Sequence, residues 1–213
     1  MNATPLFPNA RAHLRRVRTA PSTPRSETSM VIWLRGSEFR VRDESGRPSS
    51  DLLGDLTEAR GFGILPRTIE GFMDAWKLSR EPPSQVPTEL YGDLSSGEGM
   101  IREAGWPARP IDAGVIAPVA EQLLTDSRER DLEPVARATR LGRPCIEYRF
   151  DIDGAEDAVP YRTHVRWLVS APYVLLREIR DSKHDNLFAL SEVVALEEGI
   201  VTDADLHPDK SDP

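Results

Sequence analysis

Cysteine is almost absent from this chain of 213 residues, which contains only Cys145. A single thiol excludes an internal disulfide and a metal site built from several thiolates. No apolar run approaches the roughly 18 residues of a membrane-spanning helix, and the first residues show no signal peptide. The sequence as written therefore predicts a soluble cytoplasmic protein, or a periplasmic or extracellular one if a leader has been removed.

Positively charged residues are fewer than negatively charged ones and are unevenly placed along the chain. The formal net charge of -8 argues against a nucleic-acid binder, because phosphate neutralisation needs clustered cations. Residues 1–47 nevertheless contain nine arginines and only four acidic residues. This basic segment predicts contact with an acidic protein partner through Arg15, Arg16 and Arg18, or with the chain's own acidic surface, and we prefer the intramolecular interpretation.

Motifs that fix a reaction are also missing. Neither Gly61-Phe-Gly63 nor Gly97-Glu-Gly99 continues into a phosphate-binding loop, so we predict no cofactor. His164 would form an acid–base pair with Glu147 if their strands were neighbours. A solvent-facing histidine among arginines is the simpler interpretation, and we predict that the protein is not an enzyme.

Other candidates for chemistry are equally weak. Cys145 has no histidine nearby in sequence and favours an unreactive thiol on a strand. His184 stands in a turn-forming segment. His207 lies among acidic residues near the C-terminus, where a frayed tail lacks the rigid geometry of a metal site. We predict no metal ion.

Four apolar-rich runs near the C-terminus dominate the remaining pattern. Side chains alternate between two faces along them, as in antiparallel strands with one apolar and one wetted face. Short segments of Gly, Pro, Asp and Asn separate the runs. We therefore expect a meander of strands over Cys145–Ile152, Tyr161–Ser170, Tyr173–Arg180 and Leu187–Leu196.

The N-terminal part predicts fewer strands and two helices. His13–Thr19 is predicted as a basic edge strand, and Met30–Asp43 as one long strand with a bulge or bend at Gly36. Apolar residues recur at helical spacing over Pro66–Leu78 and over Ile111–Asp126, where Asp112 is the expected cap. Leu132–Ala138 predicts a further short strand.

These elements predict one α+β domain. A curved antiparallel sheet, in the form of an open half-barrel, would span residues 13–200 and carry helices on its concave face. Residues 1–12 would be a flexible lead-in, and residues 201–213 a fraying acidic tail.

The order of elements resembles a known family. A Trp-containing strand, Val31–Arg42, precedes a helix, then Arg140-Leu-Gly-Arg-Pro144, a strand ending Arg166-Trp-Leu-Val169, and a hairpin strand Tyr173–Arg180. This resembles the periplasmic lipoprotein-carrier superfamily that includes LolA, LppX and RseB. The resemblance implies an unclosed half-barrel that holds acyl chains or a lipidated partner in an apolar hollow. It also implies that Trp167 and Gly142 occupy family positions.

The site that follows from this fold is an apolar hollow. A half-barrel has a concave face too wide for its own strands to fill, so a helix or a ligand must cover it. The alternative interpretation, that the same aromatic residues form a packed core, is favoured for any single one. The candidate ligand-binding residues are Trp33, Phe39, Phe72, Trp76, Tyr148, Phe150 and Trp167.

The sequence thus favours a non-enzymatic protein that binds an apolar or lipid-like molecule. The alternative is a cytoplasmic protein-interaction module that uses the basic N-terminal edge and has no ligand. An enzyme using His164 and Glu147 is the third hypothesis.

Overall fold

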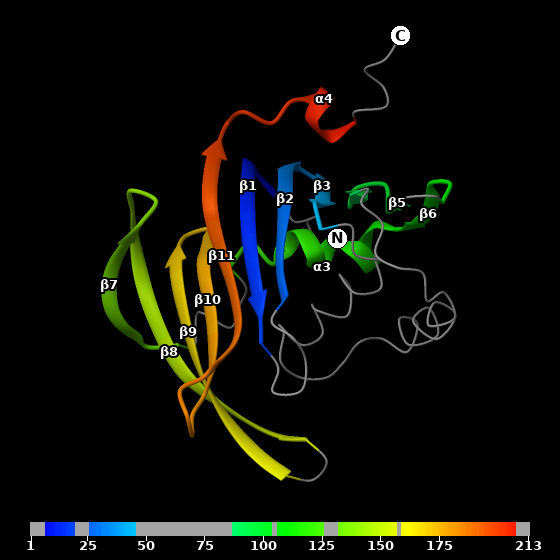
Figure 1. Ribbon diagram of the computed structural model, residues 1–213. Coiled ribbons are helices and arrows are strands. Elements are labelled where there is room, and N and C mark those ends of the chain that lie inside the picture. Colours follow the sequence, from blue (N-terminus) through cyan, green and yellow to red (C-terminus); the bar gives the residue numbers. More distant parts are fainter. Residues whose placement is uncertain are drawn as a thin grey trace. The chain divides into compact units, whose positions relative to one another are not determined.

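The computed structural model describes residues 7–19, 26–45, 87–103, 106–125, 132–156 and 159–207. Their strands hydrogen-bond in the order β6-β5-β4-β3-β2-β1-β11-β10-β9-β8-β7. The order has two ends, so the sheet is open, and every pair with a described register is antiparallel. The predicted α+β class and open antiparallel sheet are confirmed (Figure 1). The elements are β1 (Phe7–Arg18), β2 (Ser26–Gly36), β3 (Glu38–Asp43), β4 (Thr88–Asp93), β5 (Glu98–Arg102), β6 (Arg109–Asp112), α3 (Ala113–Glu121), β7 (Pro134–Arg140), β8 (Arg143–Glu156), β9 (Val159–Ser170), β10 (Tyr173–Asp181), β11 (Leu187–Glu198) and α4 (Asp203–Leu206).

Both edge strands carry features that discourage pairing with another chain. β6 is four residues long and contains Pro110, which has no N–H to donate. β7 begins at Pro134, bulges between Pro134 and Ala136, and exposes Arg137. Short strands, proline, bulges and charge are the usual protection of a sheet edge.

The chain folds into two compact units that share three strands. Unit 1 comprises Met1–Arg11, Met30–Gln122 and Glu197–Pro213, and unit 2 comprises Ala12–Ser29 and Leu123–Leu196. Strands β1, β2 and β11 contribute residues to both units.

A hairpin between β2 and β3 corrects the prediction of one long strand over Met30–Asp43. Gly36 has a φ of 62°, a conformation that glycine adopts without a steric penalty. The chain reverses there, so that Arg35 pairs with Glu38 and Leu34 with Phe39. What the sequence suggested as a bend is therefore a complete turn.

One face of unit 1 packs against helix α3. The Asp112 carboxylate accepts a hydrogen bond from the Gly114 N–H at 2.7 Å, which confirms the predicted N-cap. Buried side chains of α3, including Ile116 and Ala120, cover this face, on which Ile32, Phe39 and Leu90 are also buried. A Cβ atom at residue 92 would overlap the Phe39 ring, so the close approach requires Gly92.

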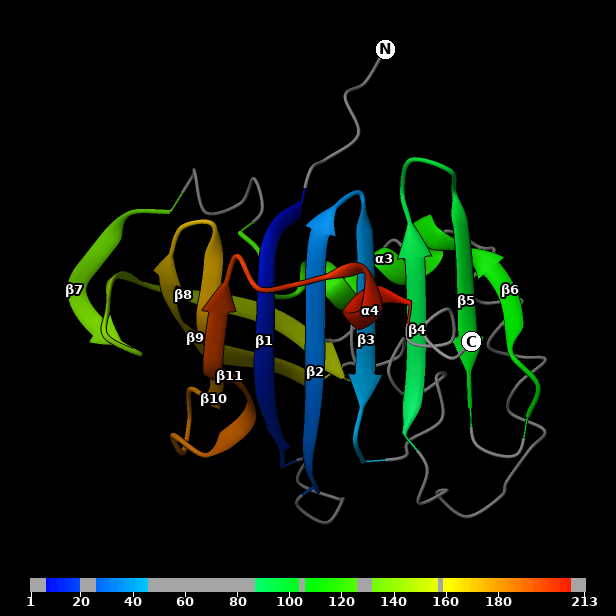
Figure 2. The same cartoon turned by 90° about the horizontal axis from the view of Figure 1, so that it is seen from above.

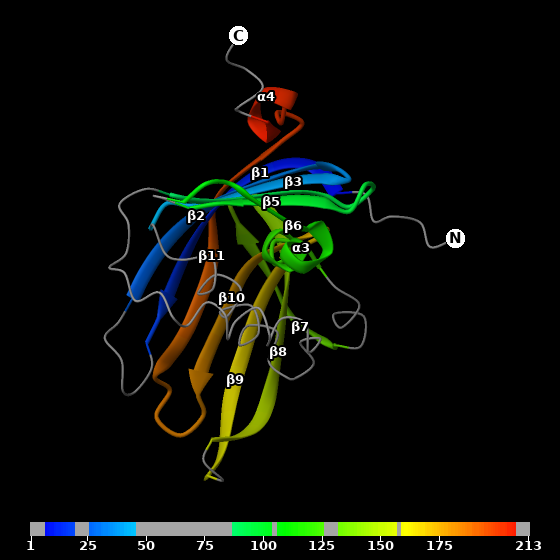
Figure 3. The same ribbon diagram turned by 90° about the vertical axis from the view of Figure 1, so that its right-hand side faces the viewer.

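The opposite face of unit 1 is covered by the C-terminal strap, Gly199–His207, which includes α4. Val201 and Leu206 are buried against Val31 and Trp33. Figures 2 and 3 show α4 and α3 on opposite sides of the unit 1 strands. Strands β2 and β3 are therefore buried on both faces.

Unit 2 contains the meander that the C-terminal runs predict. β8, β9, β10 and β11 pair in sequence order, and β7 pairs with β8 through a two-residue turn. Leu141 and Gly142 have φ angles of 53° and 72°, as in the type I′ turns that suit the twist of a hairpin. Ala171-Pro172, between β9 and β10, is a cis peptide bond.

Two predicted segment boundaries differ from the structure. The flexible lead-in was expected to reach residue 12, but β1 begins at Phe7, which is buried and packs its ring edge-on against Phe39. The acidic tail was expected to fray from residue 201, but Val201 and Leu206 are buried. The predicted helix over Pro66–Leu78 lies outside the described residues.

Candidate functional site

The apolar face of the unit 2 sheet is the candidate site. Its centre is buried and consists of Val165, Trp167 and Val169 from β9 and Val174 from β10. Side chains packed around this centre are only partly buried, and Ile146 in β8 is 42% exposed. The surrounding residues are Leu132, Tyr148, Phe150, Ile152 and Ile179.

The register explains how the aromatic side chains meet. Tyr148 in β8 lies opposite Trp167 in β9, and Phe150 lies opposite Val165. The Phe150 and Trp167 rings meet edge-to-face, with centroids 5.1 Å apart. Three of the seven predicted ligand-binding residues, Tyr148, Phe150 and Trp167, therefore gather on one face of unit 2.

The Arg177 guanidinium group also lies at this face. Arg177 pairs with Trp167 in register, and its Cζ atom is 5.3 Å from the Trp167 ring centroid. Its Nη2 donates to the Leu124 carbonyl at 3.4 Å. Arg177 is not among the ligand-binding residues predicted from the sequence, although it lies in the alternating part of β10.

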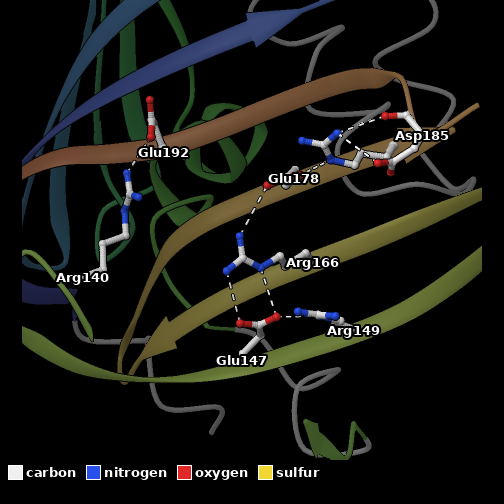
Figure 4. A network of polar contacts seen from close by, with 8 residues as sticks. Arg140, Glu147, Arg149, Arg166, Glu178, Asp185 and Glu192 are labelled. Atoms are coloured by element: carbon white, nitrogen blue, oxygen red, sulfur yellow. Dashed lines mark hydrogen bonds and ion pairs between the residues drawn. The ribbon is translucent and has the colours of Figure 1, made fainter. Parts of the chain in front are cut away.

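The other face of unit 2 carries a chain of alternating charges (Figure 4). Glu147 in β8 is buried and accepts from Arg149 at 2.6 Å and from Arg166 at 3.1 Å. Arg166 also contacts Glu178 at 3.6 Å, and Glu178 pairs with Arg180. The hydrogen bond from Arg166 lowers the pKa of Glu147 below its ordinary value despite burial.

A second set of ion pairs on this unit engages the basic N-terminal segment. Arg15 binds both Glu27 oxygens, at 2.7 and 3.0 Å, and reaches Glu192 at 3.0 Å. Arg140 donates to the other Glu192 oxygen at 2.6 Å, and these acidic partners raise the pKa of Arg15. The preferred intramolecular interpretation of the basic segment therefore holds for Arg15.

The predicted edge position of the basic strand is wrong. β1 lies between β2 and β11. Its neighbour β2 begins at Ser26, whereas the strand predicted from the sequence begins only at Met30. Arg16 and Arg18 also take part in interactions within the chain. Nothing in the described residues supports an acidic protein partner at Arg15, Arg16 and Arg18.

The hypothetical catalytic pair is not formed. β8 and β9 do pair, but the register places Asp151 opposite His164 and Leu168 opposite Glu147. The His164 Nδ1 lies 2.7 Å from an Asp151 oxygen, and both side chains are about half exposed. The pattern correctly put Glu147 and His164 on one face but could not fix how far apart they lie.

The remaining titratable candidates have structural surroundings. Cys145 is buried, and this burial raises the pKa of its thiol. His184 contacts Asp181 at 2.9 Å, and His207 contacts Glu38 at 2.7 Å. Across the described ranges, no three His, Cys, Asp or Glu residues group as metal ligands.

Two other predicted ligand-binding residues lie in unit 1. Trp33 and Phe39 belong to unit 1 and lie on opposite faces of its sheet. The tight turn at Gly36 pairs Leu34 with Phe39, which separates Phe39 from the face of Trp33. Phe72 and Trp76 lie outside the described residues.

Some solved structures resemble this chain over most of its length. The chain resembles LprF from Mycobacterium bovis at 10% identity and a TM-score of 0.39, covering 93% of this chain and 89% of that one. It also resembles a LolA superfamily protein from Nitrosomonas europaea at 9% identity and a TM-score of 0.36, covering 98% of this chain and 92% of that one. The second of these structures belongs to the superfamily that the order of elements in the sequence resembles. No protein-family model and no curated protein matches the chain.

The predicted compartment gains no support from these findings. No helix among the described residues is long and apolar enough to cross a membrane. Neither the structure nor the likenesses favour the cytoplasmic prediction, and the compartment stays undecided between the two alternatives of the sequence analysis.

Proposed function

We propose that the protein is a non-enzymatic carrier that holds an apolar or lipid-like molecule against the apolar face of unit 2. The observation that carries this proposal is the partly buried aromatic rim of Tyr148 and Phe150 around the buried Trp167. Side chains that are half-buried and apolar gain free energy, about 25 cal/mol per Å², when a ligand removes the rest from water.

The chemistry of the two faces supports an apolar ligand. On the polar face, carboxylates and guanidinium groups already bind one another from β8 to β10. The apolar face instead offers alkyl and aromatic surface beside the Arg177 guanidinium group. Binding sites for small molecules are mostly apolar with few polar groups, which matches this second face.

Cover by helices is part of the proposal. Helix α3 provides cover for strands β3 to β6 within unit 1. Phe72 and Trp76, in the predicted helix over Pro66–Leu78, stay predicted ligand-binding residues. Trp33 and Phe39 would act as core residues of unit 1.

Quenching of Trp167 by a brominated fatty acid tests the proposal. The fluorescence of Trp167 is isolated by replacing Trp33, Trp76 and Trp106 with Phe. We expect saturable quenching, and about tenfold weaker binding in Phe150→Ala, because loss of a phenyl ring removes more than a kcal/mol of apolar contact.

The matched control is Phe39→Leu, which trims a buried ring in unit 1 and should leave the fatty-acid affinity unchanged. Absence of saturable quenching, together with no lipid in an organic extract of the purified protein, would contradict the proposal. Equal weakening by Phe39→Leu would show that the effect is not local to unit 2.

A further inference from the structure

The C-terminal strap covers a cluster of arginine and aromatic side chains in unit 1. Arg40 in β3 stacks on Trp33, with its Cζ 4.7 Å from the ring centroid, and on Tyr91, at 5.5 Å. Its Nη2 donates to Glu89 at 2.5 Å, and its Nη1 donates to the Asp205 carbonyl of the strap at 2.7 Å. The strap thus supplies one oxygen to a guanidinium group that is almost fully buried.

Contacts at both ends hold the strap in place. Asn9 accepts from the Val201 N–H at 2.9 Å and donates to the Val201 carbonyl at 3.2 Å. Farther along, Arg35 pairs with Asp203, and His207 lies 2.7 Å from Glu38. These contacts hold the strap beside Trp33 and Arg40.

Three hydrogen-bond donors on this face have no partner in the part of the chain that the structure describes. They are the indole N–H of Trp33 and the Nε–H groups of Arg40 and Arg42. Trp33 and Arg40 are each only 8% exposed. Buried donors rarely stay without an acceptor, so these three donors favour the binding of an acceptor on this face.

The charges on this face indicate which acceptor fits. Arg40 and Arg42 are two residues apart on β3, and Arg102 pairs in register with Glu89. Arg40, Arg42 and Arg102 therefore lie on this face beside Glu89. Both Glu89 oxygens are already engaged, by Arg40 and by Tyr91. Arg35 and Glu38 are occupied with Asp203 and His207.

We propose that this face of unit 1 is a second binding site, for an oxyanion such as a phosphate group. Its donors are the Trp33 indole N–H and the Arg40 and Arg42 guanidinium groups. Guanidinium groups bind such oxygens with strong, charge-assisted hydrogen bonds. The strap competes with the anion, because the Asp205 carbonyl occupies Nη1 of Arg40. The site is independent of the apolar face of unit 2.

Indole N–H resonances offer a direct test. The full chain contains four tryptophans, and the signal missing in Trp33→Phe belongs to Trp33. Inorganic phosphate, added at constant ionic strength against chloride, should shift this signal, and Trp33→Phe should weaken binding by about tenfold. Trp167→Phe, the same change in unit 2, should leave phosphate binding intact.

The remaining variants and ligands separate the possible outcomes. Asn9→Ala breaks both strap contacts of that side chain and should tighten phosphate binding several-fold. Tighter binding of dihexanoyl phosphatidic acid than of phosphate would assign the anion to a lipid headgroup, and equal binding to a free anion. An unmoved Trp33 signal with both ligands, or weaker binding in Asn9→Ala, would overturn the proposal.

Discussion

The two units use a similar antiparallel sheet in different ways. In unit 1 strands β2 and β3 are buried on both faces, with α3 on one side and the strap on the other. In unit 2 one face is a chain of ion pairs and the other is an apolar surface with a half-buried rim. Aromatic residues of equal appearance in the sequence therefore have different roles. Phe39 belongs to a closed core, and Phe150 belongs to a rim.

Truncating these two phenylalanines tests the comparison between the two units, and it is the change with the largest expected effect. Phe39→Ala should lower the free energy of unfolding by about 3–5 kcal/mol, because it empties a fully buried site under α3. Phe150→Ala should cost roughly half as much or less, because its ring is already partly in water. Urea denaturation of both variants gives the two values. Equal losses would remove the distinction between core and rim.

The polar face of unit 2 supplies the next effect. Glu147 is buried between Arg149 and Arg166, so Glu147→Gln should destabilise the protein by about 1–2 kcal/mol at neutral pH. Its pKa is lowered in the folded state from the ordinary 4.5. The stabilisation is therefore complete above pH 4.5 and disappears as the pH falls through the lower folded-state pKa.

Denaturation of the wild type and Glu147→Gln across this pH range checks the sign. The exposed Glu98 in unit 1 provides the control, since Glu98→Gln should change stability little at any of these pH values. A difference between wild type and Glu147→Gln that grows toward acid pH would contradict the assigned role of Arg166.

The sequence was sufficient for features that depend on neighbouring residues. Alternation along β8 and β9 correctly separated Phe150 and Trp167 from Glu147 and His164. The cap of α3 at Asp112 was likewise visible, because an N-cap bond spans only two residues. Local patterns fix which face a side chain takes and where a helix begins.

Features that depend on register or on distant segments were not predictable in this way. A bend at Gly36 would leave Trp33 and Phe39 on the same face of one strand. The turn at Gly36 instead places them on opposite faces of the sheet. The neighbours of β1 are β2 and β11, and these two strands are more than 150 residues apart in the chain. The segment that forms the strap was predicted to fray because it is rich in acidic residues. Val201 and Leu206 are nevertheless buried and anchor it.

The smallest expected effect concerns His164, where a polar pair lies in water instead of in the core. The His164 and Asp151 side chains are 51% and 44% exposed, and exposed pairs contribute about 0–1 kcal/mol. His164→Ala should therefore change the free energy of unfolding by less than about 0.5 kcal/mol and leave fatty-acid binding unaltered. Glu147 lies four residues before Asp151 on the same face of β8 but is buried, so Glu147→Gln provides the contrast. A loss in His164→Ala as large as that in Glu147→Gln would mean that burial does not separate the two groups, and the comparison between a buried and an exposed carboxylate partner on this face would fail.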